Sequence, residues 1–138
     1  MDTKSVCDHF RIQVADYPAL MRRIIPGYDE QRDLIVRLIP FNHDQRLRVL
    51  DLGCGPGLLA EQILDGFANA ELTALDLTSE MLEACRTRLG GRARVEYRFA
   101  DLRTDVLGSD DDVIDASLFL HHLPLAERPG FCERAFAA

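Results

Sequence analysis

The sequence predicts an α/β fold, in which a doubly wound parallel sheet carries helices on both of its faces. Short apolar, partly β-branched runs alternate along the chain with segments of helical spacing. Strands separated by helices pair in parallel through right-handed crossovers. The chain has 138 residues, of which 47% are hydrophobic and 28% charged. This is the size and composition of one folded domain.

The spacing of apolar residues places the helices and strands. Short, mostly apolar runs bounded by turn residues predict strands, over residues 47–51, 71–76, 94–99 and 113–120. Apolar residues at helical spacing predict helices, over residues 17–25, 29–39, 58–66 and 79–89 and around residues 131–136. Thr78 or Ser79 can cap the helix that begins near residue 79, and Gly90 ends that helix.

The predicted elements divide the chain into two parts. Residues 1–46 are expected to form a helical cover and residues 47–138 the ligand-binding core. The cover carries an apolar stripe that we expect to pack beside the first strand, formed by Leu34, Ile35, Leu38 and Ile39. Because the chain ends inside the last predicted helix, we expect the strand over residues 113–120 to be an open edge of the sheet.

Composition and charge disfavour several classes of partner. The formal net charge is −7, and binding to a phosphate backbone requires a surface on which Lys and Arg outnumber acids. Residues 1–10 lack an apolar run, and no later stretch approaches about 20 apolar residues. We therefore expect no nucleic acid, no secretion and no membrane partner.

The cysteines lie far apart and form no Cys-x-x-Cys pair, at Cys7, Cys54, Cys85 and Cys132. Neither a zinc site nor a disulfide framework is predicted, so no metal is expected, and reduced thiols fit a cytoplasmic protein. Cys54 lies between glycines, where we interpret it as a small, inert filler.

An acid followed by alternating glycines stands at the end of the first predicted strand. Asp51 is followed by Gly53, Gly55 and Gly57, and missing β-carbons let the main chain approach a ligand closely. Asp76 ends the second predicted strand 19 residues later (76 − 57), where a carboxylate can accept hydrogen bonds from both hydroxyls of a ribose. The pattern predicts a nucleoside site, and an ordinary tight turn is the alternative.

The glycine loop resembles motif I of class I S-adenosylmethionine-dependent methyltransferases, over residues 49–57. The resemblance extends from residue 47 to about residue 123 and includes the ribose-binding, adenine-contacting and fourth-strand segments of the family, at residues 74–78, 99–102 and 115–123. It implies a Rossmann-like sheet in strand order 3-2-1-4, S-adenosyl-L-methionine as the cofactor, and methyl transfer to a small-molecule acceptor.

Alternatives to an active methyltransferase stay open. Family members continue through further C-terminal strands that are absent here, so a truncated methyltransferase fragment or a non-catalytic S-adenosylmethionine-binding subunit is also considered. An NAD-dependent oxidoreductase is less favoured, because Leu58 replaces the small residue of the dinucleotide fingerprint. Residues 21–28 also resemble the N-terminal segment of carboxy-S-adenosylmethionine synthase, which leaves that subfamily open.

The resemblance implies roles at the methionine end of the cofactor. Gly53, Gly55 and Gly57 would shape the floor beneath it. Asp51 would face the ammonium region, and Ser117 would bring a backbone oxygen near the same amine. Carboxylates near the cationic groups of the cofactor gain Coulomb energy.

The resemblance also implies roles at the nucleoside end. Asp76 would accept from the ribose hydroxyls and Asp101 from the adenine amino group, with a main-chain contact from Leu102. Leu77 or Met81 would cover a ring face. As alternatives, Asp76 is an acid stabilised by a helix N-terminus, and Asp101 is a solvated loop acid.

The remaining candidates are a tyrosine and two histidines near the expected ligand edge. Tyr28 either closes over the pocket as a lid or packs in the core. His121 or His122 can act as a general base toward a hydroxyl nucleophile; alternatively, one is packed and the other bonds the backbone. A homo-oligomer is the expected way to cover the open strand edge.

Overall fold

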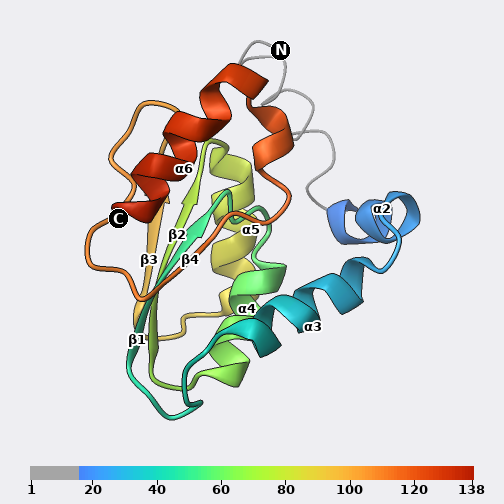
Figure 1. The fold of residues 1–138 in the computed structure, drawn as a ribbon. Coiled ribbons are helices and arrows are strands. Elements are labelled where there is room, and N and C mark those ends of the chain that lie inside the picture. Colours follow the sequence, from blue (N-terminus) through green and yellow to red (C-terminus); the bar gives the residue numbers. More distant parts are fainter. Residues whose placement is uncertain (1–15) are drawn as a thin grey trace.

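A computed structural model describes residues 16–138 of the chain. The first part of the expected helical cover, including Cys7, therefore lies outside the described residues. Parallel strands form one sheet (Figure 1): β1 (Leu47–Leu52), β2 (Ala70–Asp76), β3 (Val95–Phe99) and β4 (Val113–Asp115). The order β3-β2-β1-β4 confirms the predicted fold class and strand order.

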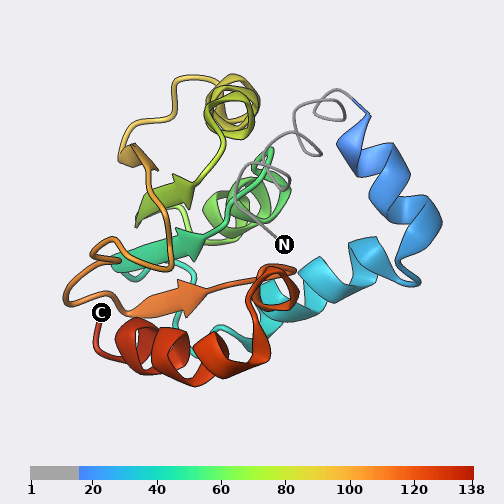
Figure 2. The ribbon, with the colours of Figure 1, turned by 90° about the horizontal axis from the view of Figure 1, so that it is seen from above.

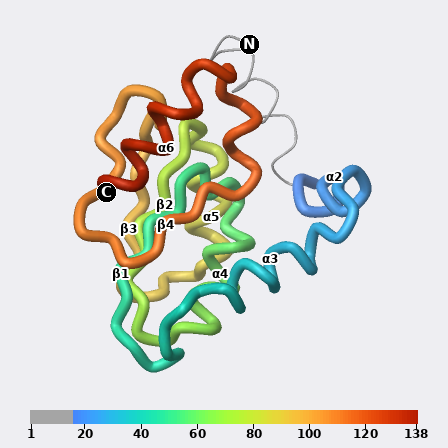
Figure 3. The backbone as a smooth tube through the Cα atoms, viewed as in Figure 1, coloured from blue at the N-terminus to red at the C-terminus, as the bar shows by residue number. Residues whose placement is uncertain are grey.

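Helices cover both faces of this sheet. The described helices are α2 (Tyr17–Ile24), α3 (Tyr28–Leu38), α4 (Leu58–Gly66), α5 (Ser79–Leu89) and α6 (Arg128–Phe136), and α2 lies away from the sheet, beyond α3 (Figures 1 and 2). Figures 1 and 2 show α4 and α5 on one face and α6 on the other. The backbone trace in Figure 3 leads from α2 through α3 into β1. The predicted helix boundaries before β3 agree with the observed ones to within one residue, because glycines and prolines mark most of them.

The larger hydrophobic cluster lies between the sheet and α4 and α5. Ile63 and Phe67 are fully buried against strand residues such as Leu72, and burial of each such side chain stabilises the fold by about 1.5–3 kcal/mol. From the N-terminal cover, Ile35 and Ile39 pack against this cluster.

The predicted apolar stripe of the cover is therefore only half right. Leu34 and Leu38 are 55% and 69% exposed. They lie on the other side of α3, because a helix turns about 100° per residue and the face toward α4 is narrow. Val36, which was not in the predicted stripe, packs against the core instead.

A second cluster lies on the opposite face, beneath α6. Leu50, Leu52 and Leu75 contribute from the sheet and Phe131 from the helix. Leu123 joins the same cluster from the segment that follows β4. The two clusters fix both faces of the sheet and so position the ends of its strands.

The fourth strand is shorter than predicted. It ends at Asp115 rather than at residue 120, and η1, a 3₁₀ helix, occupies Leu120–His122. Phe119 and Leu120 still pack against the second cluster, but from turns, with Leu118 at a φ of +56°. A short apolar run indicates that the segment is buried, but it does not distinguish a strand from a buried turn.

Candidate functional site

A cleft opens at the carboxyl ends of the strands, where open α/β sheets bind ligands. It encloses about 840 Å³, including open solvent at its mouth. Most of the predicted site residues line it: Gly53, Gly55, Asp76, Leu77, Met81, Asp101, Leu102, Ser117 and His122.

A second hollow adjoins the cleft and contains two further predicted residues, Asp51 and Tyr28. We call it the inner hollow. It shares Gly55 and Ser117 with the cleft, so the two spaces are continuous along the glycine loop. The predicted residues Gly57 and His121 line neither space.

The glycine loop is held by the end of β2. The backbone N–H groups of Gly53 and Cys54 both donate to the carbonyl oxygen of Leu75, at 2.8 and 2.9 Å. Gly55 has a φ of +53°, and a β-carbon added there would meet nothing within 4 Å. The missing side chain at Gly55 therefore leaves space open beside the cleft.

Gly57 serves packing between helices. A β-carbon added at Gly57 would lie 2.7 Å from Cys85 Sγ, on α5, so the start of α4 can approach α5 only without a side chain. The thiols of Cys54 and Cys85 also meet here; their hydrogen bond raises the pKa of Cys54 and lowers that of Cys85. Both thiols are buried. Their contact could not be predicted from the sequence, because the two residues lie far apart along the chain.

Asp76 joins the glycine loop to α5. Its Oδ2 accepts from the backbone N–H of Gly55 and its Oδ1 from that of Thr78, both at 2.9 Å. Burial raises the pKa of Asp76, while these N–H groups act in the opposite direction. The side chain of Thr78 and the backbone N–H of Leu77 lower the pKa of Asp76 in the same way, so a ligand hydroxyl that bonds this carboxylate must share it with donors of the protein. Thr78 occupies the N-cap position of α5 but makes no side-chain cap.

Asp101 lies at the rim of the cleft and is paired with Arg103. Arg103 Nε donates to Oδ1 at 3.0 Å and its Nη2 to Oδ2 at 2.7 Å, which lowers the pKa of Asp101. A ligand that bonds the Asp101 carboxylate must therefore share it with this guanidinium.

Two buried carboxyl groups meet at the centre of the sheet edge. Asp51 on β1 lies opposite Asp115 on β4 in the strand register. Asp51 is only 3% exposed, and its Oδ2 and both oxygens of Asp115 are buried. A hydrogen bond with Asp51 and one from the backbone N–H of Ser117 act on Asp115 against the effect of its burial. Burial, and then the Asp115 charge, raise the pKa of Asp51; burial raises the pKa of Asp115 to about 7.

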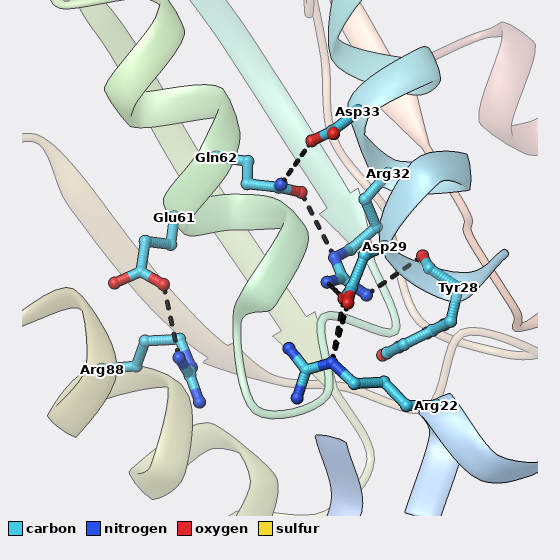
Figure 4. A network of polar contacts seen from close by, with 8 residues as sticks. All are labelled: Arg22, Tyr28, Asp29, Arg32, Asp33, Glu61, Gln62 and Arg88. Carbon is cyan, nitrogen blue, oxygen red and sulfur yellow. Dashed lines mark hydrogen bonds and ion pairs between the residues drawn. The ribbon is translucent and has the colours of Figure 1, made fainter. Parts of the chain in front are cut away.

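A buried arginine also lines the inner hollow, and Figure 4 shows its polar contacts. Arg32 is 7% exposed, and its guanidinium lies 4.2 Å from the ring centre of Tyr28. It pairs with Asp29 and donates from Nε to Gln62 Oε1 at 3.2 Å. Tyr28 is thus a buried aromatic that also lines the hollow.

Comparison with known proteins assigns this arrangement to a family. Residues 49–138 match the family model described as a methyltransferase domain. The chain belongs to this methyltransferase family. Trans-aconitate 2-methyltransferase of Rhizobium etli is 38% identical over 93 residues, covering 67% of this chain and 34% of the relative. Malonyl-[acyl-carrier protein] O-methyltransferase of Acetivibrio thermocellus is 26% identical over 114 residues, covering 83% and 38%.

Solved structures share the fold of this methyltransferase domain. The DhpI-SAM-HEP complex is 27% identical with a TM-score of 0.76, covering 98% of this chain and 59% of that chain. N-methyltransferase NodS from Bradyrhizobium japonicum, in complex with S-adenosyl-L-homocysteine, is 15% identical with a TM-score of 0.77, covering 93% and 64%. The chain spans little more than a third of the length of the two curated relatives.

Several residues at the site of this methyltransferase domain were not found from the sequence. Tyr17, Arg32, Leu118 and Phe119 all line the cleft or the inner hollow. Arg32 follows Tyr28 at i+4 on one helix, and this spacing is a signal that could have paired them. Asp115 aligns with Asp51 only through the register of strands that are distant in sequence.

The two candidate histidines of the domain have different surroundings. His122 lines the cleft, whereas His121 is exposed and does not. Their rings lie 3.9 Å apart between centroids. Among residues 16–138 there is no cluster of potential metal ligands, and no helix there is both long and apolar enough to cross a membrane.

Proposed function

We propose that the chain binds S-adenosyl-L-methionine in the cleft and transfers its methyl group to a small-molecule acceptor. The observation that carries this proposal is the position of Asp76. Its carboxylate lines the cleft at the end of the second strand and holds Gly55 through one oxygen and Thr78 through the other, and a carboxylate in this position can accept from ribose hydroxyls. In a methyltransferase domain, a carboxylate in this position fits the ribose at the nucleoside end of the cofactor.

The remaining groups fit the rest of the cofactor by their chemistry. Leu77 and Met81 offer apolar surface for a ring face, beside Asp101 and Leu102 at the adenine end. We assign the amino-acid end to the inner hollow. Such a zwitterion needs an anion and a cation, and the hollow presents the carboxyl group of Asp51 and the guanidinium of Arg32.

The chemistry requires little from side chains. When bound, the cofactor supplies a methyl group on a sulfonium, whose departure leaves a neutral thioether. The protein then contributes alignment of the acceptor and exclusion of water. His122, which lines the cleft, is the proposed general base for the proton of an acceptor hydroxyl.

Calorimetric titration tests the cofactor assignment. We expect S-adenosylhomocysteine to bind and NAD to give the same heat as buffer. Asp76→Asn removes one charged acceptor, a loss of about 1.5–3 kcal/mol, so the dissociation constant rises at least about tenfold. Asp110→Asn, in an exposed turn, is the matched control. Binding of NAD in preference to S-adenosylhomocysteine would refute the proposal.

For the acceptor we propose only a chemical class. A panel of small hydroxyl and carboxylate compounds, with labelled methyl donor, tests turnover. Binding without turnover of any compound would favour the non-catalytic subunit.

We propose a cytoplasmic protein, supported by the free thiols of Cys54, Cys85 and Cys132. We also propose a homo-oligomer that covers the open edge of β4, and a monomer by light scattering would contradict this.

A further inference from the structure

The carboxyl groups of Asp51 and Asp115 form a buried pair. They extend from neighbouring strands at the same register position. Asp51 Oδ2 and both Asp115 oxygens are buried; the backbone N–H of Ser117 acts on Asp115, and the other hydrogen bond of Asp115 is with Asp51. A hydrogen bond between two carboxyl groups requires a proton on one of them, and buried polar atoms are nearly always satisfied.

The surroundings of the pair do not supply a compensating charge. Asp76 on β2 and Cys85 on α5 face Asp51 and oppose its ionisation. Cys54, in the glycine loop, is a buried thiol. Among the residues lining the inner hollow, the cation is Arg32 on α3, and it is already paired with Asp29.

Two carboxylates in contact cannot both ionise at low cost when they are removed from water. A single proton between them supplies the missing donor and leaves one negative charge. Burial raises the pKa of Asp115 to about 7, and the pKa of Asp51 is raised as well. The two groups therefore titrate as a unit, and the proton is held through the mildly acidic range.

We propose that Asp51 and Asp115 hold one shared proton in the ligand-free protein and release it when the ammonium group of the ligand docks against them. This inference rests on the proposed function, because it places the amino-acid end in the inner hollow. One O–H bond of the pair breaks, and the proton passes to solvent. The ammonium group keeps its own protons and donates to Asp51, the member of the pair that lines the inner hollow.

The consequence is selectivity for ligands that carry an ammonium group. A neutral ligand leaves the pair protonated, whereas a cation replaces the proton in the same place. Binding of an amino-acid-bearing ligand therefore tightens as pH rises, because the proton held by the two raised carboxyl groups competes with the ligand less and less. Binding of a ligand without that group does not follow this dependence.

Proton release can be measured directly by calorimetry in buffers of different ionisation enthalpy. We compare S-adenosylhomocysteine with 5′-methylthioadenosine, which has the same nucleoside and thioether but lacks the amino-acid end. At about pH 6, below the pKa of about 7 for Asp115, we expect release of about one proton per S-adenosylhomocysteine and none with 5′-methylthioadenosine. Release should approach zero at about pH 9.

Substitution separates the pair from other sources of protons. In Asp115→Asn the amide donates to Asp51, so S-adenosylhomocysteine should still bind while proton release falls toward zero. Asp110→Asn, an exposed acid in a turn, should leave the release unchanged. A carboxyl ¹³C NMR titration of the wild-type protein needs no variant and should show an aspartate that titrates above about pH 6.

The outcomes distinguish this inference from the proposed function. Binding of S-adenosylhomocysteine without proton release overturns the inference and leaves the proposed function standing. Failure of both ligands to bind overturns both. Absence of any aspartate titrating above about pH 6 in the ligand-free protein overturns the shared proton, whatever the ligands do.

Discussion

The substitution Gly57→Ala tests whether the last glycine of the loop is required by packing. A β-carbon at this position would lie 2.7 Å from Cys85 Sγ and 3.2 Å from Cys85 Cα. The second atom belongs to the backbone of α5 and cannot rotate away. The φ of +85° at Gly57 adds strain for any other residue.

The two effects set the expected loss of stability. A left-handed conformation costs an alanine about 1–2 kcal/mol, and overpacking of a core typically costs about 1–3 kcal/mol. Together they predict a loss of about 2–5 kcal/mol, a large part of the roughly 5–15 kcal/mol that stabilises a domain. Gly55→Ala, with a φ of +53° and no neighbour within 4 Å, should lose only the strain of about 1–2 kcal/mol.

Urea unfolding monitored by circular dichroism measures both losses. The double variant Gly57→Ala, Cys85→Ala removes the shortest contact, so it should be more stable than the sum of the single losses predicts. The reasoning fails if Gly57→Ala is no less stable than Gly55→Ala, or if the two substitutions in the double variant are additive.

Three further predictions address charge and catalysis. Arg32→Met should lower the free energy of unfolding by about 1–3 kcal/mol by urea titration, because it leaves Gln62 and the Tyr28 carbonyl without their donor; Arg37→Met, exposed on the same helix, should change it by less than about 0.5 kcal/mol. Without ligand, the free energy of unfolding should fall as pH rises from about 4 to about 7. The folded protein holds the Asp115 proton more tightly than the unfolded chain does, and this contribution is lost as pH rises through the folded pKa of about 7. A profile equally steep in Asp115→Asn would contradict that assignment. Once an acceptor is known, His122→Ala should slow turnover by about 10²–10⁴-fold while His121→Ala has little effect, and equal rates would remove His122 from catalysis.

The sequence was sufficient to predict the sheet and its helices because each is encoded by local patterns. The limits of β1 and β2 follow from short apolar runs, glycines and alternating helices, whereas strand order 3-2-1-4 was implied by the resemblance to the methyltransferase family. The segment after β4 was predicted wrongly, since an apolar run there is buried through turns. Likewise, Leu34 and Leu38 satisfied the helical spacing but lie on the exposed side of α3.

The site residues that could be predicted are those whose chemistry suits a ligand and that also lie next to a predicted strand end. Asp76 and Gly55 lie next to a strand end, so the sequence alone places them in the cleft. Arg32 reaches the inner hollow only through the packing of α3 on α4, and Asp115 comes to lie beside Asp51 only through the pairing of β1 with β4. Such contacts join residues far apart in sequence, and one sequence carries no signal for them beyond the side chains themselves.

The alternating glycines show why a motif can be identified correctly and still be interpreted too simply. Gly53 lies against Phe119, with an added β-carbon 3.1 Å from that ring, and Gly57 lies against Cys85, whereas Gly55 borders open space. Packing therefore requires two of the three glycines, and the ligand-binding space requires only the middle one. The same spacing arises because one tight turn must approach β4, the cleft and α5 in succession. The motif thus encodes a tight turn with Asp51 and Asp76 on either side of it. The shape of this turn, more than any single glycine, defines the site.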